Sequence, residues 1–556
     1  MGTRKPTRLL VIGGVAGGAT AAARARRISE TAQITLLERG PYVSYANCGL
    51  PYFLSGDIRK RSALLLQTPE GFDSRYGVKV LVNTEALEID RAGARVRIRN
   101  AEGESWLEYD ALILAQGGLP STPPLPGVDS PHVFRLWTVP DMDRIQAYLE
   151  AEKPASAVIA GGGFIGLEMA EAFARRGIAV TVVEMLPRVM AGMDPEFGGL
   201  IAARLEAHGV TVLTGAGLKA VLPASREVEL ADGRRLPAAL VLLSVGVRPE
   251  LELAKAAGLA MGEAGGLRVD AHLRTSDPRI WAAGDMNEIV HKISGRKVRV
   301  PLAGPANRQG RIAASNALGL PMRYNGALGS SVVKVFDATA ASTGLSEAAA
   351  REAGFDPGAA FVVRDHHASY YPGARDLALK LVYDRKTRRL LGGQAFGEEG
   401  VEKRIDALAA ALQGRLTLED LAELDLTYAP PYSSANDPLN VAAFVGLNDL
   451  SGFSPLITAA RLREELAGGQ PPLVVDVRNL NEYEASHLRG ALHLPLDELR
   501  FRLEEVPRDR SLVVHCRSGY RSHLALRILK QNGFQQVRNL TGGYIAALAF
   551  GGFEGE

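Results

Sequence analysis

The sequence predicts an α/β protein that begins with two Rossmann-like dinucleotide-binding domains and ends with a smaller α/β domain. Two observations carry this prediction. A strand, glycine turn, helix and strand ending in an acidic residue occur twice, and about the last hundred residues alternate short apolar strands with helical segments. The composition agrees, because 46% apolar residues, 23% charged residues and 60 glycines are typical of a soluble α/β enzyme.

The first copy of the repeated pattern spans residues 8–38 and ends at the acidic residue Glu38. Its turn contains Gly13 and Gly18, and Val15 stands where the pattern has its middle glycine. The glycines allow a tight turn and close approach of the backbone to a pyrophosphate. We therefore expect the valine to move the backbone slightly away from a bound phosphate without abolishing the site.

The second copy spans residues 157–184 and carries all three glycines, Gly161, Gly163 and Gly166, before it ends at Glu184. In both copies the helix that follows the turn offers free N–H groups to a pyrophosphate, and the final carboxylate can accept a hydrogen bond from a ribose hydroxyl. Two such folds in one chain predict two dinucleotides, one held permanently and one that visits.

The chain contains only two cysteines, Cys48 and Cys516. A lone cysteine is often a small buried hydrophobe, but both occur in distinctive loops. Two cysteines in unrelated motifs do not make a disulfide framework, so we expect a reducing, cytoplasmic location. No set of His, Cys and acidic residues recurs at metal-ligand spacing, so we expect no metal.

The charge and hydropathy patterns exclude two classes of partner. The formal net charge of +2 is nearly balanced, which argues against a nucleic-acid-binding or membrane-surface protein. No apolar run approaches the roughly 18 residues of a membrane helix. We therefore expect small-molecule substrates, with neither nucleic acid nor membrane as a partner.

About the first 450 residues resemble the FAD-dependent pyridine nucleotide-disulfide oxidoreductases. The resemblance rests on the two dinucleotide folds and on the motifs AQGG at 115–118, GVRP at 246–249 and AGD at 283–285. Within this family, the segment SYANCGLPY at 44–52 is similar to the coenzyme A-disulfide reductase branch, which has a single active-site cysteine.

About the last hundred residues resemble a rhodanese, through DVR at 476–478, EY at 482–483, HLRGA at 487–491 and the loop from Cys516 to Arg521. Together the two parts resemble fusions of a coenzyme A-disulfide reductase with a rhodanese, which are also described as NADH-dependent persulfide reductases. The resemblance implies a homodimer. It also implies an FAD-binding domain at 1–150 and 275–325, an NAD(P)H-binding domain at 151–274, an α+β dimerisation domain at 326–445 and a rhodanese domain at 459–556. The glycine- and serine-rich composition of residues 446–454 predicts a linker at 446–458.

The resemblance also assigns cofactor contacts. Glu38 is expected to bind the adenosine ribose of FAD and Asp285 its ribityl chain, with a helix cap as the alternative for Asp285. Gln116 replaces the threonine that is usual in the family's Ala-Thr-Gly turn, which leaves its contact open. Glu184 favours NADH, because a carboxylate suits a free 2′-hydroxyl, while the nearby Arg188 leaves NADPH open.

Cys48 has no partner cysteine at the spacing that dithiol members of the family use. It is therefore expected to cycle through a mixed disulfide or persulfide with an external thiol. Such a cysteine must be a thiolate, which Asn47 and Ser44 could stabilise as donors. The expected oxidants are coenzyme A disulfide, coenzyme A persulfide and polysulfide.

Coenzyme A is polyanionic, and Arg24 and Arg27 fall at i, i+3 on the first helix. They are candidate ligands for its phosphates, with an ordinary solvated helix face as the equal alternative. Tyr371 and Tyr428 are candidate proton donors to the leaving thiolate, because the family uses tyrosines of the second subunit. Core or interface packing is the alternative for each tyrosine.

A related branch of the family, the NADH oxidases and peroxidases, cycles its cysteine through a sulfenic acid. That branch carries a histidine at the start of the first helix, where this chain has Ala16. Oxidase or peroxidase activity is therefore the weaker alternative.

The loop from Cys516 to Arg521 leads from an apolar strand into a helix. Such a loop directs backbone N–H groups at the cysteine sulfur, and Arg517 and Arg521 add positive charge. The loop is one residue shorter than the Cys-x5-Arg loop of phosphatases, which makes it too tight for phosphate. It favours a sulfurtransferase whose cysteine holds a sulfane sulfur, with a sulfur-carrier or docking domain as the alternative.

Overall fold

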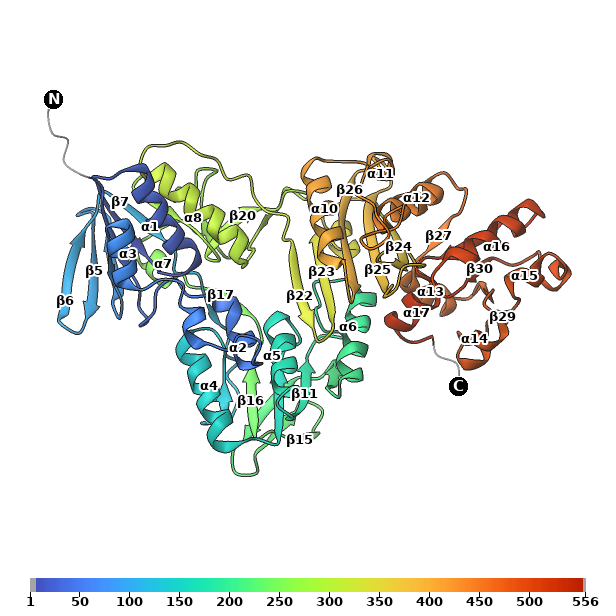
Figure 1. Cartoon of the computed structure of the whole chain (residues 1–556), viewed down its shortest axis with the longest axis horizontal. Helices are drawn as coiled ribbons and strands as arrows, with labels where there is room; N and C mark the ends of the chain where they lie inside the picture. The colour runs from blue at the N-terminus through green and yellow to red at the C-terminus, as the bar shows by residue number, and fades with distance from the viewer. Residues whose placement is uncertain (1–6, 554–556) are drawn as a thin grey trace. The chain divides into compact units, whose positions relative to one another are not determined.

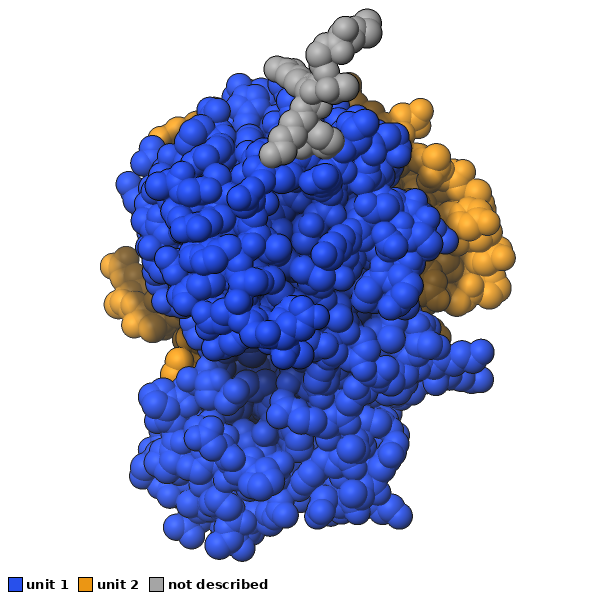
Figure 2. Space-filling model, turned by 90° about the vertical axis from the view of Figure 1, so that its left-hand side faces the viewer, with its two compact units in different colours: residues 1–183, 216–329 blue, residues 184–215, 330–556 orange. Residues whose placement is uncertain are grey.

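The computed structural model describes residues 7–553 and contains two compact units. The first unit comprises Met1–Val183 and Ala216–Gly329, and the second comprises Glu184–Gly215 and Ser330–Glu556. Figure 1 labels the helices and strands, and Figure 2 colours the two units. Each unit is described by itself below.

The first dinucleotide-binding domain is built on a parallel sheet with the order β19-β7-β1-β2-β3. Its strands are β1 (Arg8–Ile12), β2 (Gln33–Leu37), β3 (Val78–Leu81), β7 (Ala111–Leu114) and β19 (Ile280–Ala282). Every residue of β7 is buried, as expected for a central strand with helices on both faces. Helices α1 (Ala16–Ile28) and α8 (Ala303–Ala317) pack against each other, and the Thr20 hydroxyl donates to Asn307 Oδ1 at 2.7 Å (Figure 1).

The second dinucleotide-binding domain has a parallel sheet whose part in the first unit runs β11-β10-β16-β9. Its elements are β9 (Val133–Phe134), α4 (Val139–Glu152), β10 (Ser156–Ala160), α5 (Phe164–Ala174), β11 (Ala179–Glu184) and β16 (Leu240–Leu243). Strands β10 and β16 lie at the centre and are apolar almost throughout, which matches their burial.

The rest of the first unit is made of short elements around these two sheets. Those that follow β2 are α2 (Leu50–Leu54), α3 (Pro69–Tyr76), β4 (Glu85–Asp90), β5 (Arg95–Asn100), β6 (Gly103–Glu108) and β8 (Gly118–Pro120). Those later in the chain are β13 (Leu218–Leu222), β14 (Glu227–Leu230), β15 (Arg235–Pro237), β17 (Val247–Pro249), α7 (Glu252–Ala256), β18 (Leu267–Arg268), β20 (Asn287–Val290) and β21 (Lys297–Val298).

The two glycine turns have the same internal geometry. Gly13 and Gly161 have φ of 100° and 106°, in the left-handed region, where a β-carbon would lie 2.3 Å from the carbonyl oxygens of Ala115 and Ser244. A β-carbon at Gly18 or Gly166 would lie 1.7 or 2.0 Å from the carbonyl oxygen of the first glycine of the same turn. The turns therefore require glycine at their first and last positions.

The second unit contains an antiparallel sheet with the order β22-β23-β26-β25-β24. The strands are β22 (Ser331–Val335), β23 (Ala338–Gly344), β24 (Pro357–Asp365), β25 (Asp376–Asp384) and β26 (Leu390–Gly397). The other elements of this part are α6 (Pro195–Ala207), β12 (Thr211–Thr214), α9 (Glu347–Glu352), α10 (Val401–Gln413), α11 (Leu418–Ala422) and α12 (Pro438–Leu450). Strand β26 is buried along its whole length, so the core of this part lies around it.

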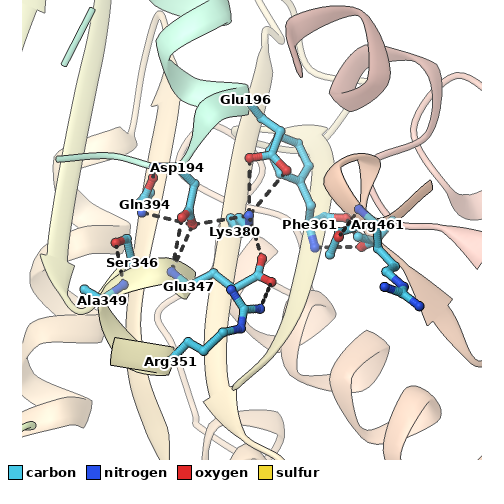
Figure 3. Close-up of polar contacts among 12 residues, drawn as sticks. Asp194, Glu196, Ser346, Glu347, Ala349, Arg351, Phe361, Lys380, Gln394 and Arg461 are labelled. Atoms are coloured by element: carbon cyan, nitrogen blue, oxygen red, sulfur yellow. Dashed lines mark hydrogen bonds and ion pairs between the residues drawn. The ribbon is translucent and has the colours of Figure 1, made fainter. Parts of the chain in front are cut away.

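A buried cation joins α6 and its N-terminal cap to this sheet. Lys380 on β25 has a side chain that is only 2% exposed, and its Nζ lies 3.2 Å from Asp194, 3.2 Å from Glu196 and 3.3 Å from Glu347. Figure 3 shows the three carboxylates converging on the ammonium group. Their negative charge raises the pKa of Lys380 despite its burial, so the lysine is charged.

The C-terminal part of the second unit is an α/β domain with a parallel sheet in the order β27-β31-β30-β28-β29. Its strands are β27 (Leu456–Ile457), β28 (Leu473–Asp476), β29 (Leu492–His493), β30 (Leu512–His515) and β31 (Val537–Leu540). Its helices are α13 (Ala459–Leu466), α14 (Leu480–Ala485), α15 (Leu496–Leu499), α16 (Tyr520–Gln531) and α17 (Gly543–Phe550). Apolar side chains form a core on each side of the sheet, as expected for parallel strands.

The segment 446–458, expected to be a linker, is ordered and packed. Helix α12 continues to Leu450, and Asp449 accepts hydrogen bonds from the Tyr383 hydroxyl at 3.0 Å and from the Leu456 backbone at 2.9 Å. Gly446 lies so close to the Tyr383 ring that a β-carbon there would be 3.0 Å from it. Gly446 therefore allows a close contact with Tyr383. A glycine that is needed for close packing cannot be told from one that makes a segment flexible by composition alone.

Candidate active sites

Cys48 lies in a single 3-10 turn, Asn47–Gly49, that leads directly into α2. The loop is fastened on one side, because the backbone N–H groups of Ala46 and Leu66 donate to the carbonyl oxygens of Leu64 and Ser44 at 2.8 and 3.0 Å. The cysteine is exposed and free, so its sulfur is accessible to an external thiol.

The surroundings of Cys48 disfavour a thiolate in the protein without cofactor. Partial desolvation raises the pKa of the Cys48 thiol, and the negative charges of Glu168 and Asp285 raise it further. A group that brings hydrogen-bond donors or positive charge to the sulfur would reverse this effect.

Glu168 is a residue at this site that the sequence reading missed. It lies on α5, inside the second glycine motif's helix, and its Oε1 accepts a hydrogen bond from the Tyr52 hydroxyl at 2.9 Å. Burial raises the pKa of Glu168. The GFIGLE segment carried the signal, since a carboxylate in the second turn of a buried, apolar helix needs a partner.

Ser44 and Asn47, the expected donors to the thiolate, have different arrangements. Ser44 has φ of 48°, in the left-handed region that non-glycine residues seldom adopt, and its backbone N–H donates to the Gly14 carbonyl at 2.7 Å. The side-chain oxygen of Asn47 accepts from the Cys48 backbone N–H at 3.0 Å, and the thiol lies 3.7 Å from the same oxygen. Asn47 therefore accepts at the sulfur in this structure.

The residues expected to hold FAD form a consistent set in the first unit. The Glu38 carboxylate accepts from the backbone N–H groups of Gly14 at 2.8 Å and Gly40 at 2.7 Å, which places it beside the glycine turn. Among the described residues, the buried Oε1 of Gln116 has no hydrogen-bond partner. Burial raises the pKa of Asp285 to about 6. Unsatisfied buried oxygen atoms and a desolvated carboxylate fit a polyhydroxylated ligand that donates hydrogen bonds.

In the second glycine turn, a β-carbon at Gly163 would meet no protein atom within 4 Å. The space beside this middle position is thus free for a phosphate, and in the first turn Val15 places a side chain at the matching position. Glu184 ends β11, and its Oε1 accepts from the Leu186 backbone at 2.8 Å. The Arg188 guanidinium donates to the Ala191 carbonyl at 3.5 Å.

Arg24 and Arg27 lie on α1, and α8 adds a third arginine, Arg311, which the sequence did not reveal. Burial lowers the pKa of Arg24, and the positive charges of Arg311 and Arg27 lower it further. The Nε of Arg24 donates to the Ser315 hydroxyl at 3.2 Å. The positive charges of Arg27 and Arg311 beside Arg24 form a site suited to a polyanion.

The tyrosines lie on two neighbouring loops of the second unit. The hydroxyls of Tyr428 and Tyr370 are 3.0 Å apart, whereas Tyr371 packs edge-on against the ring of His367. Tyr370 is 75% exposed and Tyr428 47% exposed, so both hydroxyls are available to a ligand. The structure thus pairs Tyr428 with Tyr370, the neighbour of the expected Tyr371.

A buried ion pair holds these two loops. Arg404 on α10 pairs with Asp437 at 2.9 Å, and the two side chains are 1% and 2% exposed. The same guanidinium donates to the His366 carbonyl at 2.7 Å and to the Ser433 hydroxyl at 3.3 Å. Arg404 therefore contacts both loops, through His366 before Tyr370 and through Ser433 and Asp437 after Tyr428.

Cys516 directly follows the apolar strand β30, and its loop leads into α16, as expected. The cysteine is buried, and its sulfur accepts hydrogen bonds from the Gly519 backbone N–H at 3.2 Å and the Ser522 hydroxyl at 3.5 Å. Arg521 forms a two-pronged ion pair with Glu482 at 2.6 and 2.7 Å, and Arg517 pairs with Asp376. The loop thus directs one backbone N–H and one hydroxyl at the sulfur of Cys516.

Family profiles match three successive parts of the chain. Residues 7–310 match the family described as pyridine nucleotide-disulphide oxidoreductase, and residues 330–438 match its dimerisation domain. The chain belongs to the pyridine nucleotide-disulphide oxidoreductase family. Residues 458–548 match the rhodanese-like domain. These matches and the structure confirm the predicted fold class, and FAD and NAD(P)H are the cofactors of this family.

Among curated relatives, the NAD(P)H sulfur oxidoreductase (CoA-dependent) of Pyrococcus abyssi is 38% identical over 438 residues, which cover 79% of this chain and 97% of the relative. Two solved structures cover almost the whole chain. Reduced Bacillus anthracis CoADR-RHD has a TM-score of 0.94 and 39% identity, with 98% of each chain covered. The NAD-dependent persulfide reductase of A. fulgidus has a TM-score of 0.91 and 38% identity, with 97% of this chain and 99% of that chain covered.

Residues 7–553 lack two kinds of feature. No cluster of three or more His, Cys, Asp or Glu side chains in this part of the chain could hold a metal ion. None of its helices is both long enough and apolar enough to span a bilayer.

Proposed function

We propose that this chain is an FAD-dependent NAD(P)H reductase of coenzyme A disulfide, coenzyme A persulfide or polysulfide, with a fused sulfurtransferase domain. One observation carries the proposal: Cys48 is exposed at the first site, and the only other cysteine is buried in a separate loop. Without a resolving cysteine, the external thiol must form the second half of the disulfide. The names of the relatives, which include coenzyme A and persulfide, support that choice of thiol.

The first half of the reaction forms a bond at Cys48. Its thiolate attacks the sulfur bound to coenzyme A, which gives a Cys48–coenzyme A mixed disulfide and releases coenzyme A thiolate from a disulfide, or hydrosulfide from a persulfide. The arginines Arg24, Arg27 and Arg311 hold the phosphates of the substrate. Tyr428 and Tyr370 of a second subunit donate a proton to the departing sulfur.

The second half returns the cysteine to its starting state. FAD, when bound, supplies the two-electron chemistry that connects NAD(P)H with sulfur. Two electrons cleave the mixed disulfide, Cys48 regains its thiolate, and coenzyme A leaves as a thiol after it takes up a proton. Glu184 selects the nicotinamide cofactor that lacks a 2′-phosphate, NADH.

The Cys516 thiolate attacks the sulfane sulfur of a donor such as thiosulfate, which leaves as sulfite, and the resulting Cys516 persulfide passes that sulfur to an acceptor thiolate and regains its own thiolate. The Gly519 N–H and the Ser522 hydroxyl stabilise the sulfur anion in both states. A coenzyme A persulfide made or consumed at this site would be the substrate that Cys48 reduces. The enzyme works as a homodimer in a reducing cytoplasm, where both cysteines remain free thiols.

The decisive experiment follows NADH oxidation by the holoenzyme with coenzyme A persulfide. Cys48→Ser should lower kcat by at least about a hundredfold, because the covalent intermediate cannot form. Cys516→Ala should leave this reduction intact and remove sulfur transfer from thiosulfate. Full persulfide reduction by Cys48→Ser would refute the proposal, and so would oxygen or peroxide consumption far above disulfide turnover.

A further inference from the structure

The sulfurtransferase loop does not stand alone, because the C-terminal domain is fastened to the antiparallel sheet of the same unit. The Thr541 hydroxyl accepts from the Phe361 backbone N–H at 2.8 Å and donates to the Phe361 carbonyl at 3.1 Å. Gly542 follows, and a β-carbon there would lie 2.4 Å from the Phe361 ring. Thr541 and Gly542 directly follow β31, the neighbour of β30, so this contact places the Cys516 loop near β24 and β25.

The two arginines of the loop are neutralised in different ways. Arg521 pairs with Glu482, which belongs to the same domain, and both side chains are 27% exposed. Arg517 pairs instead with Asp376, the first residue of β25 in the dimerisation domain, and these side chains are 50% and 47% exposed. The Arg521 pair is thus an internal brace, whereas the Arg517 pair is open to solvent.

Arg517 is the cation next to the nucleophile in sequence, and a carboxylate from another domain occupies it. A carboxylate and an oxyanion of thiosulfate or phosphate make the same two-pronged contact with a guanidinium group. An anionic substrate that approaches Cys516 must therefore displace Asp376 before it can use Arg517.

We propose that Asp376 completes the mouth of the sulfurtransferase site and selects against anionic sulfur donors by competing with them for Arg517. The inference rests on the proposed role of Cys516. It makes the site a composite of two domains, and it makes Asp376 a specificity-determining residue that touches Arg517 without touching the reacting sulfur.

The expected size of the effect follows from the exposure of the pair. An ion pair that is half exposed to water contributes little, so release of Arg517 should strengthen the binding of an anion by about two- to fivefold. The pair lies at the surface, so high salt should reduce this difference.

The test compares the wild-type holoenzyme with Asp376→Asn, with thiosulfate as the anionic donor and an uncharged organic trisulfide as the neutral donor. Asp376→Asn should lower KM for thiosulfate by about two- to fivefold, leave kcat unchanged, and leave KM for the trisulfide unchanged. Asp376→Glu should restore the wild-type KM. An equal KM for thiosulfate in wild type and Asp376→Asn, or an equal fall for both donors, would overturn the proposal.

Asp365→Asn is the matched control. Asp365 lies opposite Asp376 in the β24–β25 register and loses the same charge, yet it is not the partner of Arg517. It should leave the thiosulfate KM near the wild-type value. If Asp365→Asn lowered KM for thiosulfate as much as Asp376→Asn does, the overall negative charge near the site would be responsible and not the ion pair with Arg517. That result would also overturn the proposal.

A second measurement does not depend on sulfur transfer. Phenylglyoxal should modify Arg517 faster in Asp376→Asn than in wild type, and thiosulfate should protect the arginine more strongly in the variant. Peptide mass spectrometry identifies the modified residue. If Cys516→Ala retained sulfur transfer, the proposed role of Cys516 would fail, while Arg517 modification would still decide whether Asp376 competes with anions.

Discussion

At the scale of single residues, the structure explains why Cys48 needs its ligands. Desolvation, Glu168 and Asp285 all raise the pKa of the thiol, so in the protein alone they favour the neutral thiol over the thiolate. Glu168 is itself tied to Tyr52, which fixes its carboxylate near the sulfur. The reactivity of Cys48 therefore depends on the bound cofactor and substrate. A neutral thiol is also oxidised less readily than a thiolate while no ligand is bound.

Glu168→Gln should lower the pKa of Cys48. The carboxylate favours the neutral thiol, so removal of its negative charge favours the thiolate, and the alkylation rate of Cys48 near neutral pH should rise. A shift of up to about one pH unit is expected in the pH profile of iodoacetamide alkylation, followed on the peptide that contains Cys48. Tyr52→Phe removes the hydrogen bond but keeps the charge, and should shift the profile less. An unchanged profile in Glu168→Gln would contradict this account.

At the scale of elements, the functional groups come from the ends of strands and the first turns of helices. Cys48 precedes α2, Cys516 joins β30 to α16, and the glycine turns join β1 to α1 and β10 to α5. Helices α1 and α8 pack so closely that a β-carbon at Gly310 would lie 2.1 Å from the Gly17 carbonyl oxygen. This packing brings Arg311 to Arg24, which are far apart in sequence.

Arg311→Gln should weaken binding of substrates that carry the coenzyme A phosphates. Loss of one guanidinium–phosphate contact should raise KM for coenzyme A disulfide by about tenfold, with little effect on kcat. Arg323→Gln removes one exposed positive charge from the same unit outside the cluster, and should leave KM nearly unchanged. Steady-state kinetics of the holoenzyme measure both. Equal KM values in the two variants would remove Arg311 from the phosphate site.

Lys380→Met should destabilise the second unit by about 3–5 kcal/mol, because it leaves the buried carboxylates of Asp194 and Glu196 without their cation. Lys386→Met, an exposed lysine beyond the end of the same strand, should change stability by less than about 0.5 kcal/mol. Urea unfolding of the full chain, followed by a probe in the second unit, compares them. Similar unfolding midpoints would show that the cluster is dispensable.

At the scale of the whole molecule, the proposed homodimer assigns each reductase site residues from two subunits, with Cys48 from one and Tyr428 from the other. Such an arrangement makes activity depend on assembly, because a lone subunit would lack the proton donor. The Cys516 site differs from the Cys48 site in this respect. Its contact from another domain, Asp376, comes from the same chain.

A heterodimer that combines a Cys48→Ser subunit with a Tyr428→Phe subunit tests this arrangement. If the tyrosine acts across the interface, one of its two sites contains both native residues, and the purified heterodimer should show about half of the wild-type activity. The two mutant homodimers, each with both sites defective, are the controls. Activity no higher than that of these controls would place the tyrosine in the same subunit as the cysteine that it serves.

The local structure of the glycine turns and of the cysteine loops was predictable from sequence alone. The geometry of a contiguous segment is indicated by its residue types, because few residues other than glycine fit a left-handed turn or a close backbone contact. This holds for the glycine turns, the acidic ends of strands and the cysteine loops. The two dinucleotide folds and the C-terminal α/β domain followed from them. Gly446 falls in the predicted linker and packs against the Tyr383 ring, since glycine permits close packing as readily as flexibility.

Only the tertiary structure decided which side chains meet. Tyr52 and Glu168 are 116 residues apart in sequence, Arg517 and Asp376 are 141 apart, and Tyr370 and Tyr428 are 58 apart. No local pattern encodes such pairs, because each depends on how separately formed elements pack. The sequence by itself thus determined the fold class and the two cysteine loops, while packing decided which charges and hydroxyls surround the cysteines.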